Sequence, residues 1–224
     1  MNFAGVQSVT IAEGDVKSVA IGGVTVWTKP NPLPYDAEVE YLESTGTQYI
    51  DTGITPGDNA VEWEFSFEYT KPSSGAEGIF GSRQTATAYR PDGYNVFALS
   101  SGLRLDCTSR SGIYSNPTNP VLLEFGSSNT TVNGRNYHNG TKAACDYSLC
   151  IFAINTAGNI TASGSRGKGK IYYCKIWKSG VLVRDYIPVR VGSGAGAVGY
   201  LYDRVSGTLY GNAGTGSFTA GPDK

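Results

Sequence analysis

The sequence predicts an all-β protein, an antiparallel two-sheet β-sandwich preceded by a small N-terminal β-meander. Residues 61–69 alternate without a break between apolar and polar side chains, which is the period of a half-buried strand. Further short apolar runs follow, separated by glycine turns such as Asp92-Gly93 and Ser179-Gly180. No stretch of a dozen residues carries a helical apolar stripe. Together these observations favour a sandwich or a barrel.

The composition narrows the class of protein. The 224 residues include 30 glycines and 15 tyrosines, which suits many short strands joined by tight turns. A formal net charge of -1 supplies no basic field to attract nucleic acid or an anionic membrane. No apolar run reaches the roughly 20 residues that cross a bilayer, so we expect no membrane insertion. The first residues show no secretory signal, so a role outside the cell implies another export route, assembly into a particle, or a mature fragment of a longer precursor.

Residues 1–29 predict a small separate β module. The pattern of residues 6–11 recurs ten residues later, and a third short run ends at Trp27. Three short strands form a meander that buries little apolar surface. Residues 30–37 hold three prolines, which cannot pair in a central strand and favour an extended linker. The sandwich is therefore expected over residues 38–224.

Within the sandwich the strand candidates lie at 61–69, 78–82, 94–100, 103–108, 121–126, 130–132, 149–155, 170–178 and 181–189. On the first of these we expect Trp63, Phe65 and Phe67 to be buried, while Glu62 and Glu64 face solvent. The densest basic stretch is predicted to be a solvated strand edge and comprises Arg166, Lys168, Lys170, Lys175 and Lys178.

Three segments resemble a known family. Residues 41–53, YLESTGTQYIDTG, resemble the opening of concanavalin A-like, laminin-G-like domains of gut bacteria and their phages. Residues 170–189 and 199–212 are similar to the closing hairpin and tail of those domains. The resemblance covers about residues 38–220 and implies a lectin-type jelly roll on bacterial or phage tail-associated surface proteins. Residues 11–27 are similar to short β modules on phage tail and prophage structural proteins, which assemble inside the host.

Glycosidases share this fold, so an enzyme is an alternative to a binding protein. The laminarinase-like branch needs Glu-x-Asp-x-Glu on one strand, and two carboxylates must flank the sugar bond. Glu62, Glu64 and Glu68 lack the central acid and have the wrong spacing, so a solvated strand face explains them. The single histidine, His138, lies beside no nucleophile motif. We therefore expect a protein that is not an enzyme.

No cofactor is expected, with calcium as the alternative that the resemblance raises. Asp58-Asn59 and Asp92 with Asn95 offer the oxygen ligands that calcium prefers, although turn formation explains both. The four cysteines match no zinc signature. We expect buried free thiols, and a disulfide stays open without a defined pairing; the cysteines are Cys107, Cys145, Cys150 and Cys174.

Three expected loops place tyrosine beside arginine or asparagine and glycine. A tyrosine ring can stack on the apolar face of a sugar while amides and guanidinium groups bind its hydroxyls, and protein-binding loops use the same residues. Turn-decorating tyrosines are the alternative. The candidate ligand-binding residues are Tyr89, Arg90, Tyr94, Arg110, Tyr114, Asn136 and Tyr137.

These observations favour a non-catalytic binding or adhesion domain. The hypothesis is a phage or prophage tail-associated protein, on a virion or an extracellular surface, that recognises a cell-surface glycan or protein. The N-terminal module would join it to other virion or cell-surface proteins, and weak single sites favour homo-oligomers or arrays. The alternatives are a purely structural decoration domain and, third, a glycosidase on the same fold.

Overall fold

The structure is a computed structural model that describes residues 18–21, 24–28, 33–57, 61–85, 93–107, 110–115, 117–126, 129–138, 144–160, 164 and 166–224. The chain divides into two compact units, residues 1–33 and 34–224. In the first unit β1 (Ser18–Ile21) and β2 (Val24–Thr28) pair antiparallel. The first strand of the expected meander lies outside the described residues. Across the described part of the chain, no helix is long and apolar enough to span a membrane.

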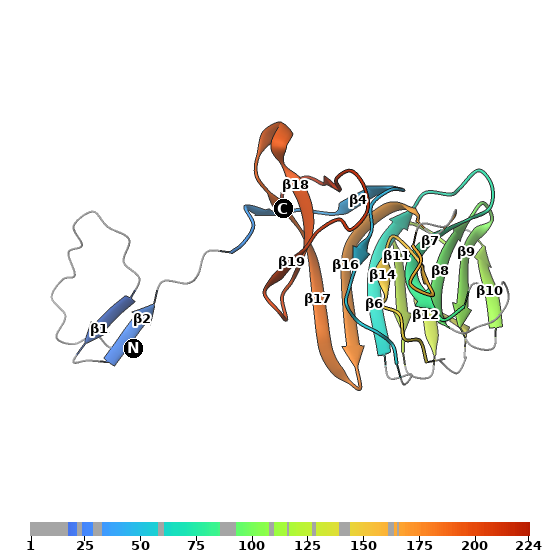
Figure 1. The fold of residues 1–224 in the computed structure, drawn as a ribbon, viewed down its shortest axis with the longest axis horizontal. Helices are drawn as coiled ribbons and strands as arrows, with labels where there is room; N and C mark the ends of the chain where they lie inside the picture. Colours follow the sequence, from blue (N-terminus) through green and yellow to red (C-terminus); the bar gives the residue numbers. More distant parts are fainter. Residues whose placement is uncertain are drawn as a thin grey trace. The chain divides into compact units, whose positions relative to one another are not determined.

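The second unit is a β-sandwich of two antiparallel sheets, as the sequence predicted (Figure 1). The smaller sheet runs in the order β10 (Arg110–Ser115), β9 (Gly102–Cys107), β8 (Gly93–Leu99), β7 (Ala76–Arg83), β14 (Cys150–Ile151) and β5 (Ile50–Asp51), with the short β15 (Asn155–Thr156) paired parallel to β7.

The larger sheet runs in the order β13 (Arg135–His138), β12 (Thr130–Val132), β11 (Val121–Phe125), β6 (Val61–Tyr69), β16 (Lys168–Lys178), β17 (Val181–Val191), β18 (Val198–Asp203) and β19 (Thr208–Tyr210). Three short strands add to it: β3 (Ala37–Glu38) pairs with β17, and β4 (Leu42–Thr45) pairs with both β16 and β20 (Thr219–Ala220). One 3-10 turn, η1 (Gly194–Gly196), precedes β18.

The inner side chains of β6 form the centre of the core. Trp63, Phe65 and Phe67 are each at most 2% exposed, which confirms the expected inward face. Between the sheets the Trp63 ring lies 5.0 Å from that of Phe80 and 5.1 Å from that of Tyr94. Burial of such large aromatic rings contributes much of the free energy that holds two sheets face to face.

Two segments predicted as loops are strands. The segment from Arg110 to Tyr114 was expected to be a loop, but in β10 Gly112 pairs with Leu105 in a regular antiparallel ladder. In β13 Asn136 pairs with Thr131 in the same way. Both are edge strands, where a polar, glycine-containing sequence is tolerated because one side of the ladder faces solvent.

Two further expectations about strands were wrong. β16 was predicted as a solvated edge, yet it pairs with β6 on one side and with β17 and β4 on the other. Its lysines are tolerated on a central strand because they can project from the outer face of the sheet. There they pair with neighbouring side chains or stay hydrated. The expected strand 149–155 is broken at Phe152, whose φ of 61° separates β14 from β15.

A β-bulge in β16 decides which of its side chains face outward. Before it Lys170 pairs with Glu68, and after it Tyr173 pairs with Ser66, so Tyr172 is the extra residue. Such an insertion switches the alternation of the strand by one residue. Beyond the bulge Cys174 and Ile176 are fully buried. The odd-numbered residues from 173 to 177 therefore lie on the outer face.

Candidate ligand-binding face

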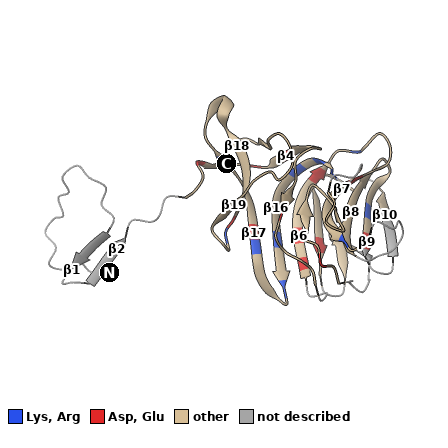
Figure 2. Cartoon of the chain, in the orientation of Figure 1, with Lys and Arg blue, Asp and Glu red and all other residues tan. Residues whose placement is uncertain are grey.

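The outer face of the larger sheet carries one row of polar side chains that crosses six strands. Each member pairs with the next across neighbouring strands. We call it the polar row; its members are Asp185, Lys175, Glu64, Glu124, Thr131 and Asn136. Figure 2 marks the acidic positions of β6 and the basic positions of β16 and β17. The row places carboxylates at the centre of the face.

Both central carboxylates of the polar row have partners within the sheet. The Lys175 ammonium lies 3.9 Å from a Glu64 carboxylate oxygen, and both side chains are about one-third exposed, at 35% and 28%. The Thr131 hydroxyl donates a hydrogen bond to the Glu124 carboxylate. Glu64 and Glu124 face each other directly across β6 and β11. Their mutual repulsion is thus offset by one cation and one hydroxyl donor.

Tyr173 stands beside the polar row and shares its carboxylates. Lys175 lies 5.6 Å from the centre of its ring, and the Glu64 and Glu124 carboxylates act on its hydroxyl. Burial, followed by the hydrogen bond and charge of Glu64 and the charge of Glu124, raises the pKa of Tyr173 to about 12. The phenol therefore stays protonated at neutral pH and remains a donor.

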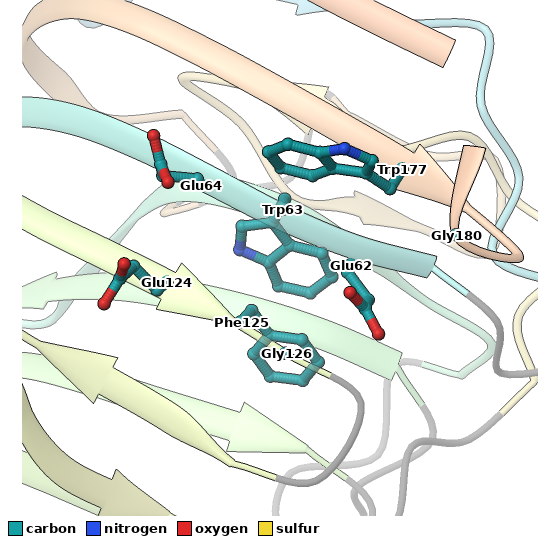
Figure 3. A pocket seen from close by; sticks show the side chains of 8 residues that line it. All are labelled: Glu62, Trp63, Glu64, Glu124, Phe125, Gly126, Trp177 and Gly180. Atoms are coloured by element: carbon teal, nitrogen blue, oxygen red, sulfur yellow. The ribbon is translucent and has the colours of Figure 1, made fainter. Parts of the chain in front are cut away.

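A pocket opens on this face next to the polar row (Figure 3). It has a volume of about 360 Å³ and is lined by Glu62, Trp63, Glu64, Glu124, Phe125, Gly126, Trp177 and Gly180. Trp63 and Phe125 belong to the core below, where their rings stack at 4.0 Å. The three carboxylates and the Trp177 ring form its polar and aromatic walls. Gly180 has a φ of 76° and turns the chain from β16 into β17.

Two side chains of the pocket have no polar, aromatic or cationic partner among the described residues. Glu62 has no hydrogen-bond or ion-pair partner there, in contrast to Glu64 and Glu124. The half-buried Trp177 ring has no aromatic or cationic neighbour among the described residues. These two residues are a directly opposed pair of β6 and β16. The two side chains therefore start from neighbouring positions on the outer face, about 5 Å apart between their Cβ atoms, and in Figure 3 they extend in different directions.

The structure assigns Tyr94, one of the seven sequence-predicted site residues, to the core. Its side chain is fully buried, and its ring packs 5.1 Å from Trp63 and 5.6 Å from Phe125. It lies near the start of β8 and faces inward, so it presents no stacking surface to a ligand. Tyr89 and Arg90 lie outside the described residues.

The remaining predicted residues fall on two edge strands. Arg110 begins β10, and Tyr114, which is half-buried against the core, lies four residues further along it. Asn136 and Tyr137 lie on β13, and β10 and β13 contact each other where the same edges of the two sheets meet. Asn136 is exposed and belongs to the polar row, where its amide oxygen accepts a hydrogen bond of 3.4 Å from Asn129.

Register decides which end of the sandwich each segment occupies. The rings of Trp63, Tyr94 and Phe125 lie together, so the start of β6, the start of β8 and the end of β11 share one end. Arg110 pairs with Cys107, which pairs with Tyr94, so the start of β10 belongs to this end too. The pocket lies at the same end, which we call the pocket end. Tyr114 lies toward the other end, opposite Leu103.

Sequence reasoning missed the pocket because its walls come from three strands. Glu62 and Trp177 were treated separately, the first as part of a solvated strand face. The apolar spacing of Ile171, Cys174 and Ile176, three residues and then two, is a bulge signal that turns Trp177 outward. With that signal the aromatic residue and the acidic strand could have been placed on one face.

No metal or cofactor site was found in the described ranges. No group of three or more His, Cys, Asp or Glu side chains there could hold a metal ion. For calcium, Asp58, Asn59 and Asp92 lie outside the described residues, and Asn95 is 4% exposed within β8. Cys145, Cys150 and Cys174 are free and buried. Burial raises the pKa of the Cys174 thiol, so it stays protonated in the core.

No family model and no curated protein matches the chain. The fold is similar to the crystal structure of a proposed carbohydrate-binding protein from Bacteroides ovatus, with a TM-score of 0.51 at 10% identity over 82% of this chain and 60% of that one. A sialidase from Streptococcus pneumoniae gives a TM-score of 0.40 at 10% identity, over 80% of this chain and 39% of that one. The chain thus spans 60% and 39% of these two structures. At this identity the first likeness shows a shared β-sandwich fold.

Proposed function

We propose that the second unit is a non-catalytic glycan-binding domain whose ligand occupies the pocket beside the polar row. The observation that carries the proposal is the Trp177 ring. No described ring or cation covers it, and it lines a pocket with three carboxylates on the solvent face of a sheet. A sugar presents an apolar face that stacks on such a ring and hydroxyls that donate to carboxylates. The fold likeness to a proposed carbohydrate-binding protein from Bacteroides ovatus supports the same class of ligand.

We place this domain on a phage or prophage tail-associated protein, at a virion or extracellular surface. The resemblance of residues 41–53 and 11–27 to such proteins supports the placement. The first unit would attach the domain to other virion or cell-surface proteins. One stacked sugar contributes on the order of 1 kcal/mol, so useful adhesion would come from several copies on one particle.

The experiment is a glycan array that carries bacterial surface polysaccharides, probed with the whole chain and with a Trp177→Ala variant. Wild-type protein should bind a subset of glycans, and the variant should lose about fivefold in affinity for all of them, as expected for about 1 kcal/mol. A matched control is Tyr202→Ala, which also removes a half-buried aromatic ring of the larger sheet, on β18 away from the pocket. Array binding that Trp177→Ala leaves unchanged places the site elsewhere. Binding to host proteins alone favours a protein ligand.

A glycosidase is the second candidate, because Glu64 and Glu124 are opposed carboxylates beside a pocket. Directly opposed strand residues have Cβ atoms about 4.5–5.5 Å apart, a separation that retaining glycosidases also use for their carboxyl groups. A general acid, however, needs an apolar environment that keeps it protonated. Glu64 instead lies 3.9 Å from the Lys175 ammonium, and Glu124 accepts from Thr131. We therefore propose binding without cleavage.

A further inference from the structure

We propose that the pocket selects sugars that carry a free amino group and rejects anionic sugars. This inference rests on the proposed glycan-binding function and names the ligand class of the same pocket. Its basis is the pairing of Glu62, which has no partner in the described part of the protein, with the uncovered indole of Trp177. An ammonium group is the one common sugar substituent that satisfies both at once.

The charges around the pocket set its selectivity. Three carboxylates line it, and one of them, Glu64, has the Lys175 ammonium at 3.9 Å. Lys178, at the end of β16, donates a hydrogen bond of 3.4 Å to the Thr55 carbonyl instead. The described residues that line the pocket thus carry a net negative charge. A sugar carboxylate, phosphate or sulfate would be repelled, and an ammonium would be attracted.

The geometry assigns a separate task to each wall. Glu62 accepts a charge-assisted hydrogen bond from the ammonium, and the face of Trp177 binds the same cation and the adjacent apolar side of the sugar ring. Glu64 and Glu124 keep their partners in the polar row and contribute charge at longer range. Removing the carboxylate of Glu62 should therefore abolish selectivity for the amine, while removing Trp177 should weaken binding of every sugar.

The test uses one backbone in two forms, a β-1,4-linked glucosamine tetramer and its fully N-acetylated counterpart, titrated calorimetrically into the whole chain. N-acetylation removes the positive charge and leaves the linkage unchanged. We expect the amine form to bind about tenfold more tightly at low salt, with the preference shrinking as ionic strength rises. Glu62→Gln should remove this preference by weakening the amine form alone. Trp177→Ala should weaken both forms.

Glu68→Gln is the matched control. Glu68 lies on the same face of β6, about 20 Å along the strand, and accepts a hydrogen bond from Tyr172. It should change neither affinity, and far-UV circular dichroism should show that every variant is folded. If both forms bind equally and Trp177→Ala abolishes that binding, the amine selectivity is overturned. The glycan site itself is then kept. Amine binding that survives Glu62→Gln unchanged overturns the assignment of Glu62. No binding of the amine form at millimolar concentration overturns the inference, while the glycan array decides the broader function.

Discussion

The same substitution at two tryptophans on neighbouring strands should affect two different properties of the protein. Trp63 on β6 is 2% exposed, whereas Trp177 on β16 is half-buried on the outer face. The two lie one residue apart in register, because Trp63 pairs with Ile176 and Trp177 pairs with Glu62. Trp63→Ala should therefore cost stability, and Trp177→Ala should cost binding.

The size of the stability loss follows from the packing of Trp63. Its ring stacks on Phe125 at 4.0 Å and contacts Phe80 and Tyr94 at 5.0 and 5.1 Å. Replacing such a buried tryptophan with alanine costs about 3–5 kcal/mol, which includes the cavity that it leaves. For a domain of this size we expect the thermal midpoint to fall by about 6–20 °C. Trp177→Ala should cost about 1 kcal/mol or less.

Urea unfolding followed by far-UV circular dichroism measures both values without relying on tryptophan fluorescence. The slope of the free energy of unfolding against urea should stay constant, so that the midpoint reports stability. Equal losses for the two variants would refute the assignment of Trp177 to the outer face, and with it the pocket. A harmless Trp63→Ala would refute the inward assignment of β6.

Four other experiments test separate parts of the structure. Gly81→Ala should destabilise by about 2–4 kcal/mol in urea unfolding, because Gly81 has a φ of 139° and a Cβ there would collide with the Tyr94 carbonyl oxygen; an unchanged midpoint would contradict that backbone path. Burial, followed by the charge of Tyr210, raises the pKa of Tyr186 above its ordinary value near 10, so its contribution to stability is complete below about pH 10 and is lost above it. The thermal midpoint of Tyr186→Phe should therefore fall less steeply than that of the parent above pH 10, and parallel profiles would show that Tyr186 does not titrate with unfolding. Incubation with β-glucans, capsule and cell-wall polysaccharides should release no reducing ends, and release that Glu64→Gln abolishes would establish a glycosidase. A chain that begins at Pro34 should unfold cooperatively near the parent midpoint, since it holds one complete sandwich, and aggregation would show that the first unit completes the core.

The sequence was sufficient to predict the fold class because the period of β6 is unambiguous. Nine residues alternate inward and outward without interruption, and one face holds aromatic side chains. The glycine turns then bounded most neighbouring strands. Prediction failed where a strand lies at an edge. β10 and β13 contain Ser-Gly and Asn-Tyr sequences that resemble turns, and only pairing with β9 and β12 makes them strands.

The candidate site was less predictable than the fold because it depends on register across distant segments. Seven loop residues were chosen for their chemistry, yet Tyr94 lies in the core and Asn136 alone belongs to the polar row. Glu62 and Trp177 are far apart in sequence, and their pairing depends on the single extra residue Tyr172. Without that bulge Trp177 would face the core, since a shift of one residue reverses the two faces of a strand.

The pocket lies far from the two chain ends of the second unit. β17 starts at Val181, next to Gly180 of the pocket, and runs about 33 Å to its last residues. There Val189 pairs with Glu38, and the Lys224 backbone N–H donates to the Glu38 carbonyl at 3.0 Å. Both ends of the sandwich chain therefore meet away from the pocket.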